Sequence, residues 1–135
     1  FTKHFGNINS RASKMGAPAA LSSSLHGHTY GITSDPLTQF ACVLSALIHD
    51  ADHQGVPNTT LIAEEDPLII KYGGKSLAEQ NSVDKAWDLL MTNHYKPLVA
   101  VLCRDEDELK RLRQLVVNSV MATDIMDPSL KNLRN

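Results

Sequence analysis

The strongest constraint on the fold is a helical spacing of apolar residues that begins directly after a proline. Asp35 and Pro36 are typical of a helix start, because the aspartate can cap the first turn and proline needs no backbone hydrogen bond there. Six apolar residues then recur at intervals of three and four, as on one face of a helix: Leu37, Phe40, Ala41, Leu44, Leu47 and Ile48. Val43 widens this face. We therefore expect a helix that ends near His49 and Asp50 and is buried on most sides.

Similar helix signals recur along the rest of the chain. Asp66 precedes another proline, and Gly73 with its following glycine is typical of a helix end. Ser76 and Glu79 match a capping box, and the acidic run 105–108 precedes a long apolar stripe. No segment shows sustained alternation of apolar and polar residues with β-branched side chains. The predicted fold class is all-α, a compact multi-helix bundle.

The composition excludes several classes of protein. The 13 basic and 15 acidic residues give a net charge of −2, which offers no electrostatic footprint for nucleic acid. No apolar stretch approaches the roughly 20 residues that span a bilayer, so no membrane contact is expected within this segment. Two cysteines, Cys42 and Cys103, are too few for a disulfide framework, and the apolar neighbours of Cys42 predict a buried thiol.

The chain is predicted to have two parts. Residues 1–34 are poorly patterned, with scattered glycines and a run of three serines, and are expected to be mostly loop. Residues 35–135 carry the helical patterns. The chain begins with Phe1, and its last helical pattern still runs at Asn135, so we expect a segment of a longer protein.

The densest chemical cluster is His49-Asp50-Ala51-Asp52-His53. Adjacent imidazole and carboxylate groups suit a divalent cation at a helix end. A carboxylate can also bridge two ions, and paired ions activate a water for attack on phosphorus. His53 lies one helical turn after His49, where it can orient that water. The alternative interpretation is an ordinary polar helix end.

This cluster opens a longer motif. Residues 49–58 read HDADHQGVPN, which resembles the HDxDHxGxxN signature of the class I 3′,5′-cyclic nucleotide phosphodiesterases. Residues 122–125 read ATDI and resemble the ATDM motif of that family. Four stretches between the two motifs match the family in the same order: 64–72, 76–81, 87–91 and 109–120. The resemblance covers about residues 35–135 and implies an incomplete phosphodiesterase-like bundle of the HD superfamily.

The resemblance implies a metal site. His49 and Asp50 match metal ligands, and Asp50 matches the carboxylate that bridges the two ions. In the family one ion is zinc and the other magnesium or manganese. His53 matches a catalytic histidine that contacts the hydroxide between the ions. Glu79 matches a glutamate in the water network of the second ion.

Three further residues match the surroundings of that site. Asn58 matches a structural asparagine close to it. Thr123 and Asp124 match a pair that lines the metal side of the substrate pocket. The alternative role of Thr123 and Asp124 is to cap a helix C-terminus. The alternative role of Glu79 is to form the capping box with Ser76.

The sequence also departs from the family. No tyrosine-histidine-asparagine motif precedes His49, and His26 and His28 lack its flanking residues. Asn81 and Ser82 stand where the family has two histidines, and Gln54 replaces a common proline. The last metal-binding aspartate and the glutamine that holds the purine are expected beyond Asn135. Only half of the ligand set of the first ion is therefore present.

The implied function is hydrolysis of cAMP or cGMP to the 5′-nucleotide in signal transduction. The implied location is the cytoplasm, where the substrate is found, although the parent protein can be tethered to a membrane elsewhere. We expect this chain alone to be inactive, because it lacks the general acid and half of the ligands. Two alternatives remain: another HD-superfamily phosphohydrolase that uses His26 or His28, and a catalytically dead helical module for binding or regulation.

Overall fold

The computed structural model describes residues 24–128. The chain divides into two units, Phe1–Asp35 and Pro36–Asn135, and each is described by itself. In the first unit, residues 24–28 are helical and η1 (Ile32–Ser34) is a short 3₁₀ helix. A side-chain contact joins these two turns, because His26 Nδ1 lies 2.6 Å from the Ser34 hydroxyl oxygen.

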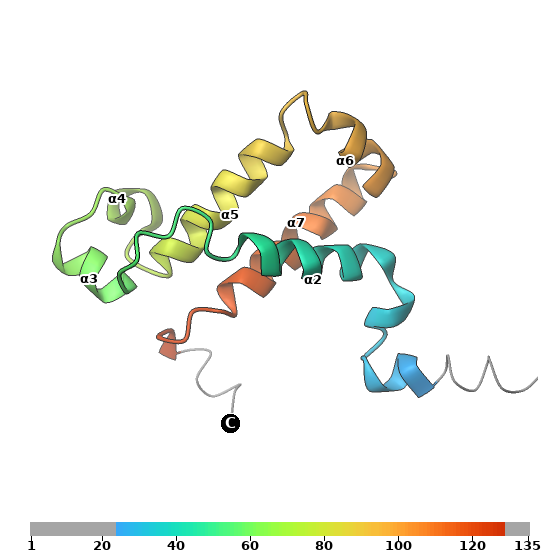
Figure 1. The fold of residues 1–135 in the computed structure, drawn as a ribbon, viewed down its shortest axis with the longest axis horizontal. Helices are drawn as coiled ribbons and strands as arrows, with labels where there is room; N and C mark the ends of the chain where they lie inside the picture. The colour runs from blue at the N-terminus through green and yellow to red at the C-terminus, as the bar shows by residue number, and fades with distance from the viewer. Residues whose placement is uncertain (1–23, 129–135) are drawn as a thin grey trace, which may run out of the picture. The chain divides into compact units, whose positions relative to one another are not determined.

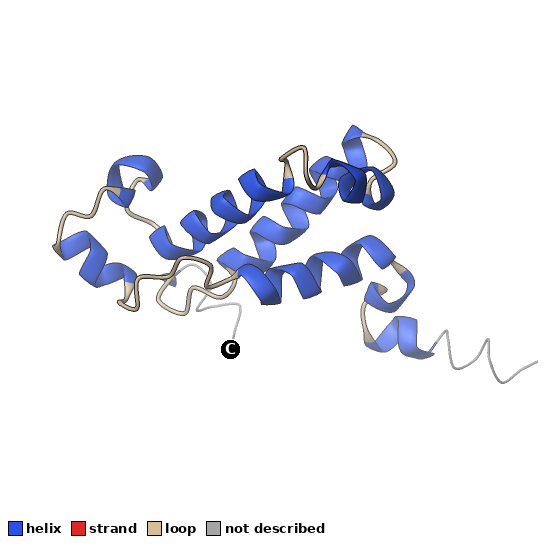
Figure 2. Ribbon diagram, turned by 45° about the horizontal axis from the view of Figure 1, so that its top comes forward, coloured by secondary structure: helices blue, strands red, loops and turns tan. Residues whose placement is uncertain are grey.

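The second unit is built from helices alone within the described residues, which confirms the predicted all-α fold class (Figures 1 and 2). The long helices α2, α5 and α7 pack together, with α7 against both of the others. The shorter helices α3 and α4 adjoin α5. The helix bounds are α2 (Pro36–Ile48), α3 (Asn58–Ala63), α4 (Leu68–Tyr72), α5 (Leu77–Leu90), α6 (Lys96–Leu102) and α7 (Glu106–Met121).

Several helix boundaries follow from local chemistry. The backbone N–H of Glu108 donates to Asp105 Oδ1 at 2.9 Å, so Asp105 caps α7 as its sequence position predicts. Gly73 ends α4 with a φ of +68°, in the left-handed region that glycine adopts without steric cost. α2 also begins and ends close to the predicted positions.

The core lies where the three long helices meet. Its buried residues come from α2, α5, α7 and the turn before α7: Ala41, Val83, Cys103, Leu112, Val116 and Val120. Because α5 and α7 run in opposite directions, this packing brings the start of α5 close to the end of α7 (Figure 1). The end of α2 reaches the same region, where Ser82 bonds to Ala51.

The prediction that α2 is buried on most sides is wrong. Val43 is 71% exposed and Leu47 is 80% exposed. Cys42, predicted to be buried, is exposed as well. Only the stripe of α2 that includes Ala41 and Ser45 is buried. Periodicity identified the correct face, but the surrounding helices cover less of α2 than its apolar content suggests.

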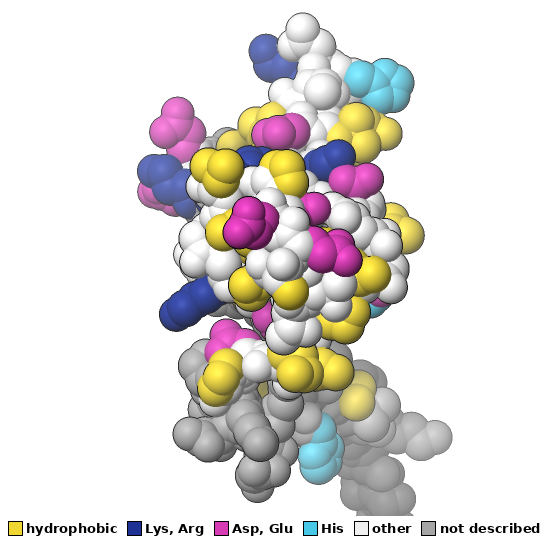
Figure 3. All heavy atoms as spheres, turned by 90° about the vertical axis from the view of Figure 1, so that its left-hand side faces the viewer, with side chains coloured by type: hydrophobic (Ala, Val, Ile, Leu, Met, Phe, Trp, Pro, Cys, Tyr) yellow, Lys and Arg dark blue, Asp and Glu magenta, His cyan; other side chains and the backbone are white. Residues whose placement is uncertain are grey.

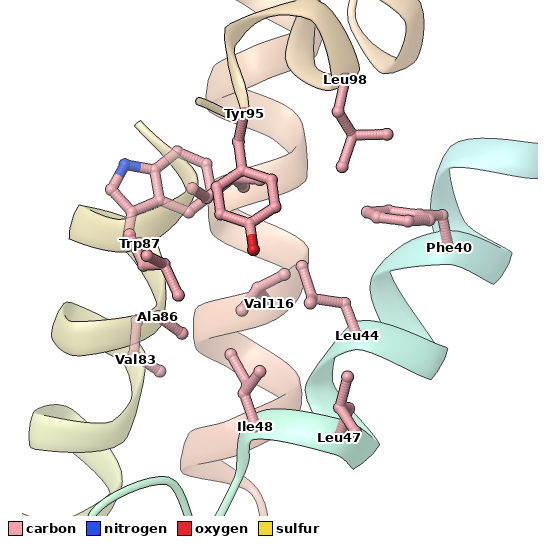
Figure 4. Close-up of a pocket in the computed structure, with 12 residues that line it drawn as sticks. Phe40, Leu44, Leu47, Ile48, Val83, Ala86, Trp87, Tyr95, Leu98 and Val116 are labelled. Atoms are coloured by element: carbon pink, nitrogen blue, oxygen red, sulfur yellow. The ribbon is translucent and has the colours of Figure 1, made fainter. Parts of the chain in front are cut away.

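An apolar pocket of about 250 Å³ lies between α2, α5, α7 and the start of α6. Figure 4 shows Trp87 and Tyr95 on one side of it and Phe40 and Leu44 on the other. Its lining contains no acidic residue and no histidine. This pocket therefore lacks the groups that acid–base or metal chemistry needs.

The exposed surface of α3 and α4 is mixed in character. Glu64 and Glu65 are exposed beside apolar side chains such as Ile70, which is 92% exposed. The space-filling view shows acidic and apolar side chains interspersed on this face (Figure 3). Among residues 24–128, none of the helices combines the length and the apolar character that crossing a bilayer requires.

Candidate functional site

The predicted site residues gather where three chain segments meet. These segments are the end of α2, the start of α5 and the turn that follows α7 (Figures 1 and 2). Two hydrogen bonds join them. Ser82 donates to the carbonyl oxygen of Ala51 at 2.8 Å, and the Ser76 hydroxyl donates to Asp124 Oδ2 at 2.7 Å.

His49 and Asp50 form a close pair at the end of α2. His49 Nε2 lies 3.1 Å from Asp50 Oδ2, and the two side chains are 40% and 69% exposed. His49 Nδ1 lies 2.9 Å from the carbonyl oxygen of Ala46, which can only accept, so Nδ1 must carry the proton. The second nitrogen, Nε2, faces Asp50 Oδ2, and this contact is attractive when Nε2 also carries a proton or when both atoms bind a cation. In metal-binding histidines, the ring nitrogen that does not bind the ion commonly donates to a backbone carbonyl oxygen, as Nδ1 of His49 does.

The separation of the pair suits two ligands of one ion. Ligands that are each about 2.0–2.1 Å from a shared zinc ion lie roughly 3 Å apart. Within residues 24–128, however, no three side chains of His, Cys, Asp or Glu gather closely enough to hold an ion. The pair therefore has the chemistry of two metal ligands, and the described residues bring no third such side chain to it.

His53 is oriented differently. The backbone N–H of Gly55 donates to His53 Nδ1 at 2.9 Å, so this nitrogen carries no proton. In the neutral ring the proton is then on Nε2, where it can be donated to a water or an anionic oxygen. The His53 side chain is exposed.

Asn58, the first residue of α3, organises the carboxylates of the site. Its side-chain nitrogen donates to Glu79 Oε2 at 2.8 Å, and its side-chain oxygen accepts from the backbone N–H of Ala78 at 3.0 Å. The same nitrogen lies 3.5 Å from Asp124 Oδ2, at the outer limit of a hydrogen bond. Asn58 therefore holds Glu79 and the first turn of α5 in place.

Asp124 is 6% exposed, and its polar neighbours satisfy both of its oxygens. Ser76 bonds to Oδ2, and the backbone N–H of Met126 donates to Oδ1 at 2.9 Å. A buried carboxylate needs such donors to offset the loss of water. Asp124 also lines a pocket of about 390 Å³ together with Asn58 and Ser76.

Thr123 lies on a different depression from its neighbour Asp124. Thr123 and His49 line a pocket of about 380 Å³, together with Cys42, Ser45 and Ser119. The Thr123 hydroxyl donates to the carbonyl oxygen of Val120 at 2.7 Å, as expected of a residue at a helix end. Thus His49 and Thr123 share one pocket, whereas Asn58 contacts Glu79 and Asp124.

The predicted capping box at the start of α5 is wrong. Ser76 has a positive φ of 41° and makes no side-chain capping bond. Its hydroxyl bonds to Asp124 instead, and Glu79 bonds to Asn58. The two side chains that would cap the helix are therefore used in contacts between distant segments. Asn58 likewise directs its side chain to α5.

Sequence reasoning missed a second group of polar residues on α5. Asn81 Nδ2 donates to Asp52 Oδ2 at 3.1 Å, and Lys85 Nζ lies 2.7 Å from the same oxygen. Hydrogen bonds from Lys85 and Asn81 lower the pKa of Asp52 below its ordinary value. One feature of the sequence could have indicated this polar group. Asn81 and Ser82 stand at the two positions where the family has histidines.

The fold and the site define an all-α bundle in which a histidine–aspartate pair ends one helix beside the first turn of another. The family model described as 3′5′-cyclic nucleotide phosphodiesterase matches residues 20–130. The chain belongs to this family.

Individual relatives agree with this assignment. The chain is 31% identical over 118 residues to the human "cGMP-inhibited 3′,5′-cyclic phosphodiesterase 3A", covering 74% of this chain and 10% of that protein. It is 33% identical over 86 residues to the mouse "Dual specificity calcium/calmodulin-dependent 3′,5′-cyclic nucleotide phosphodiesterase 1C", covering 64% of this chain and 12% of that protein. The chain thus spans about a tenth of the length of these relatives.

One solved structure matches the fold closely. It is the crystal structure of the phosphodiesterase domain of the RhoPDE fusion protein from the choanoflagellate Salpingoeca rosetta, with a TM-score of 0.64 and 30% sequence identity. The match covers 73% of this chain and 30% of that chain.

Proposed function

We propose that the protein that contains these residues hydrolyses 3′,5′-cyclic nucleotides, cAMP or cGMP, to 5′-nucleotides. Water adds to phosphorus, the bond from phosphorus to the 3′ oxygen breaks, and that oxygen takes a proton. The observation that carries the proposal is the His49–Asp50 pair, with its 3.1 Å separation and exposed position at the end of α2. Membership of the phosphodiesterase family supports it.

His49 and Asp50 would hold divalent ions, zinc together with magnesium or manganese. Asp50 is the residue suited to both ions, because it has two oxygens and is the more exposed of the pair. When bound, such ions activate water and neutralise phosphate charge. The other ligands come from residues outside 24–128, since the described residues supply only this pair.

His53 and Glu79 take the neighbouring roles. His53 donates the proton on Nε2 to the attacking water or to a phosphate oxygen. Glu79 accepts from Asn58 through Oε2, and its Oε1 would accept from water that a bound ion holds. For substrate contacts we assign Asn58 and Asp124 to the pocket of about 390 Å³ that they line, and Thr123 to the separate pocket of about 380 Å³ that it shares with His49.

Residues 35–135 form the catalytic segment in this proposal, and residues 1–34 lead into it. The general acid that protonates the leaving 3′ oxygen lies outside residues 24–128. We therefore propose that the chain alone is inactive and that the complete protein acts in cyclic nucleotide signalling in the cytoplasm.

Replacement of Asp50 tests the proposal. Asp50→Asn removes a negative charge that would help to hold divalent ions, so the ions would bind less well and would activate water less. In the full-length protein we expect turnover of cAMP and cGMP to fall by roughly three orders of magnitude or more. Turnover is measured over a range of magnesium and manganese concentrations.

Asp88→Asn is the matched control, because Asp88 is exposed on α5 and has no place in the site. It is expected to leave turnover unchanged. Near-normal turnover of Asp50→Asn would show that the His49–Asp50 pair is only a polar helix end, and the proposal would be wrong.

A further inference from the structure

The segment between α2 and α3 carries His49, Asp50 and His53 and has an unusual backbone. Asp52, in its middle, has a φ of +61°. Residues other than glycine rarely adopt this left-handed region, although aspartate and asparagine do so most readily. Such a conformation persists when surrounding contacts hold it.

Those contacts come from one stretch of α5. Asn81 and Lys85, one helical turn apart, both reach Asp52 Oδ2, at 3.1 Å and 2.7 Å. Ser82 bonds to the carbonyl oxygen of Ala51 at 2.8 Å. Asn81 is 6% exposed and Ser82 is fully buried, whereas the Asp52 side chain is 56% exposed, so the contacts with the loop are partly buried. We call Asn81, Ser82 and Lys85 the α5 anchor.

The α5 anchor lies between two groups of site residues. On the loop side, Ala51 and Asp52 are flanked directly by Asp50 and His53. On the helix side, Glu79 is two residues before Asn81 on α5. The distance between Glu79 and the loop groups therefore depends on how the loop is tied to α5.

We propose that Asn81 and Lys85 are positioning residues, which act through Asp52 to hold Asp50 and His53 in register with Glu79. This inference rests on the proposed hydrolysis of cyclic nucleotides. Neither residue touches the substrate. Two members of the anchor, Asn81 and Ser82, stand at the positions where the family has its two histidines.

The first measurement is independent of activity. In Asn81→Leu the donor to Asp52 is lost while a side chain of similar size fills the buried space. We expect the backbone amides of His53 and Gly55 to exchange hydrogen at least tenfold faster at equal global stability. These amides report on the loop, because they bond to Asp50 and to His53. Unchanged exchange would overturn the proposal.

The second measurement is catalytic and uses the full-length protein. We expect Asn81→Leu to lower kcat by about 10- to 100-fold, because small displacements of catalytic groups cost that much, while KM for the nucleotide changes little. Asn81→His restores a donor nitrogen and is expected to recover most of kcat. If the Asn81→Leu protein does not fold, the same measurements are made on Lys85→Met, which alters an exposed side chain.

Asp52→Gly separates the anchor from the backbone conformation. Glycine adopts the left-handed region freely, so activity would survive if only the backbone shape mattered. We expect it to fall as in Asn81→Leu. Asp84→Asn is the control, because Asp84 ties α5 to Lys71 of α4 at 3.0 Å without reaching the loop.

The outcomes separate the two proposals. An inactive wild-type protein contradicts the proposed function and removes the reaction that the anchor would serve. An active wild-type protein whose Asn81→Leu and Lys85→Met variants keep normal kcat overturns the positioning role alone.

Discussion

His49 and His53 are four residues apart, yet the main chain uses their Nδ1 atoms in opposite ways. Nδ1 of His49 gives its proton to the carbonyl oxygen of Ala46, whereas Nδ1 of His53 accepts from the N–H of Gly55. His49 therefore keeps Nε2 for the Asp50 carboxylate or a cation shared with it, and His53, when neutral, carries its proton at Nε2. One suits a ligand, and the other suits a donor to water or phosphate.

The two histidines should therefore respond differently to mutation. His53→Ala removes a proton donor and no ligand, so we expect kcat in the full-length protein to fall by about 10²-fold. The concentration of magnesium or manganese that gives half-maximal activity should stay the same. Steady-state assays across a metal titration measure both quantities. A shift in the metal requirement as large as that of Asp50→Asn would assign His53 to the ions instead.

At the scale of elements, the start of α7 combines two kinds of stabilisation. Asp105 caps the helix, and three acidic residues follow in the first turn, where the helix dipole favours negative charge. Arg104 closes the turn by bonding to Glu108 through both its side chain and its backbone N–H. These bonds lower the pKa of Glu108 from its ordinary 4.5 to about 2.

This pKa shift makes the helix start sensitive to acid. A carboxyl group with a lowered pKa in the folded state stabilises that state above its ordinary pKa. The contribution is lost as the pH falls from 4.5 toward about 2. Glu108→Gln should therefore lower the urea midpoint near neutral pH, and the difference from wild type should shrink over this acid range. A difference that is constant with pH would exclude the ion pair as its source.

At the scale of the whole molecule, the three long helices share one small core. Leu112 is completely buried and Val116 is 1% exposed, and both belong to α7 at the centre of the packing. α7 contacts both α2 and α5. The ends of all three helices depend on this contact, so the core also fixes the place where the site residues meet.

Truncation in the core should therefore be costly. We expect Leu112→Ala to reduce the free energy of unfolding by about 2–5 kcal/mol, through lost burial and the cavity left behind. Val43→Ala is the control, since Val43 is 71% exposed and should change stability by less than about 0.5 kcal/mol. Urea unfolding measures both. Equal losses of stability in the two variants would mean that the packing of α7 does not stabilise the fold.

The chain as a whole should bind metal weakly. His49 and Asp50 provide two ligands, whereas zinc in proteins usually has three or more. Zinc added to the 135-residue chain should be lost on dialysis, as measured by atomic absorption. Zinc retained in a one-to-one ratio would show that further residues of this chain, such as His26 or His28, complete a site.

Local patterns predicted the features of this fold that local forces decide. The apolar spacing in α2 and the cap at Asp105 depend on neighbouring residues, so the sequence predicts them well. The serine at position 76 shows where such reasoning fails. Its hydroxyl bonds to Asp124, 48 residues away, and no local pattern reports that contact. The exposure of Cys42 was missed for the same reason, since it depends on which helices cover α2.

The position of Asp124 also has a consequence for folding. Its contacts with Ser76 and Asn58 span 48 and 66 residues of chain. Closing such loops costs entropy that only later contacts offset, so distant pairs form after local helices. The polar network around Asp124 should thus assemble last, with low φ-values for Ser76 and Asn58. Mutations there would speed unfolding and leave the folding rate nearly unchanged.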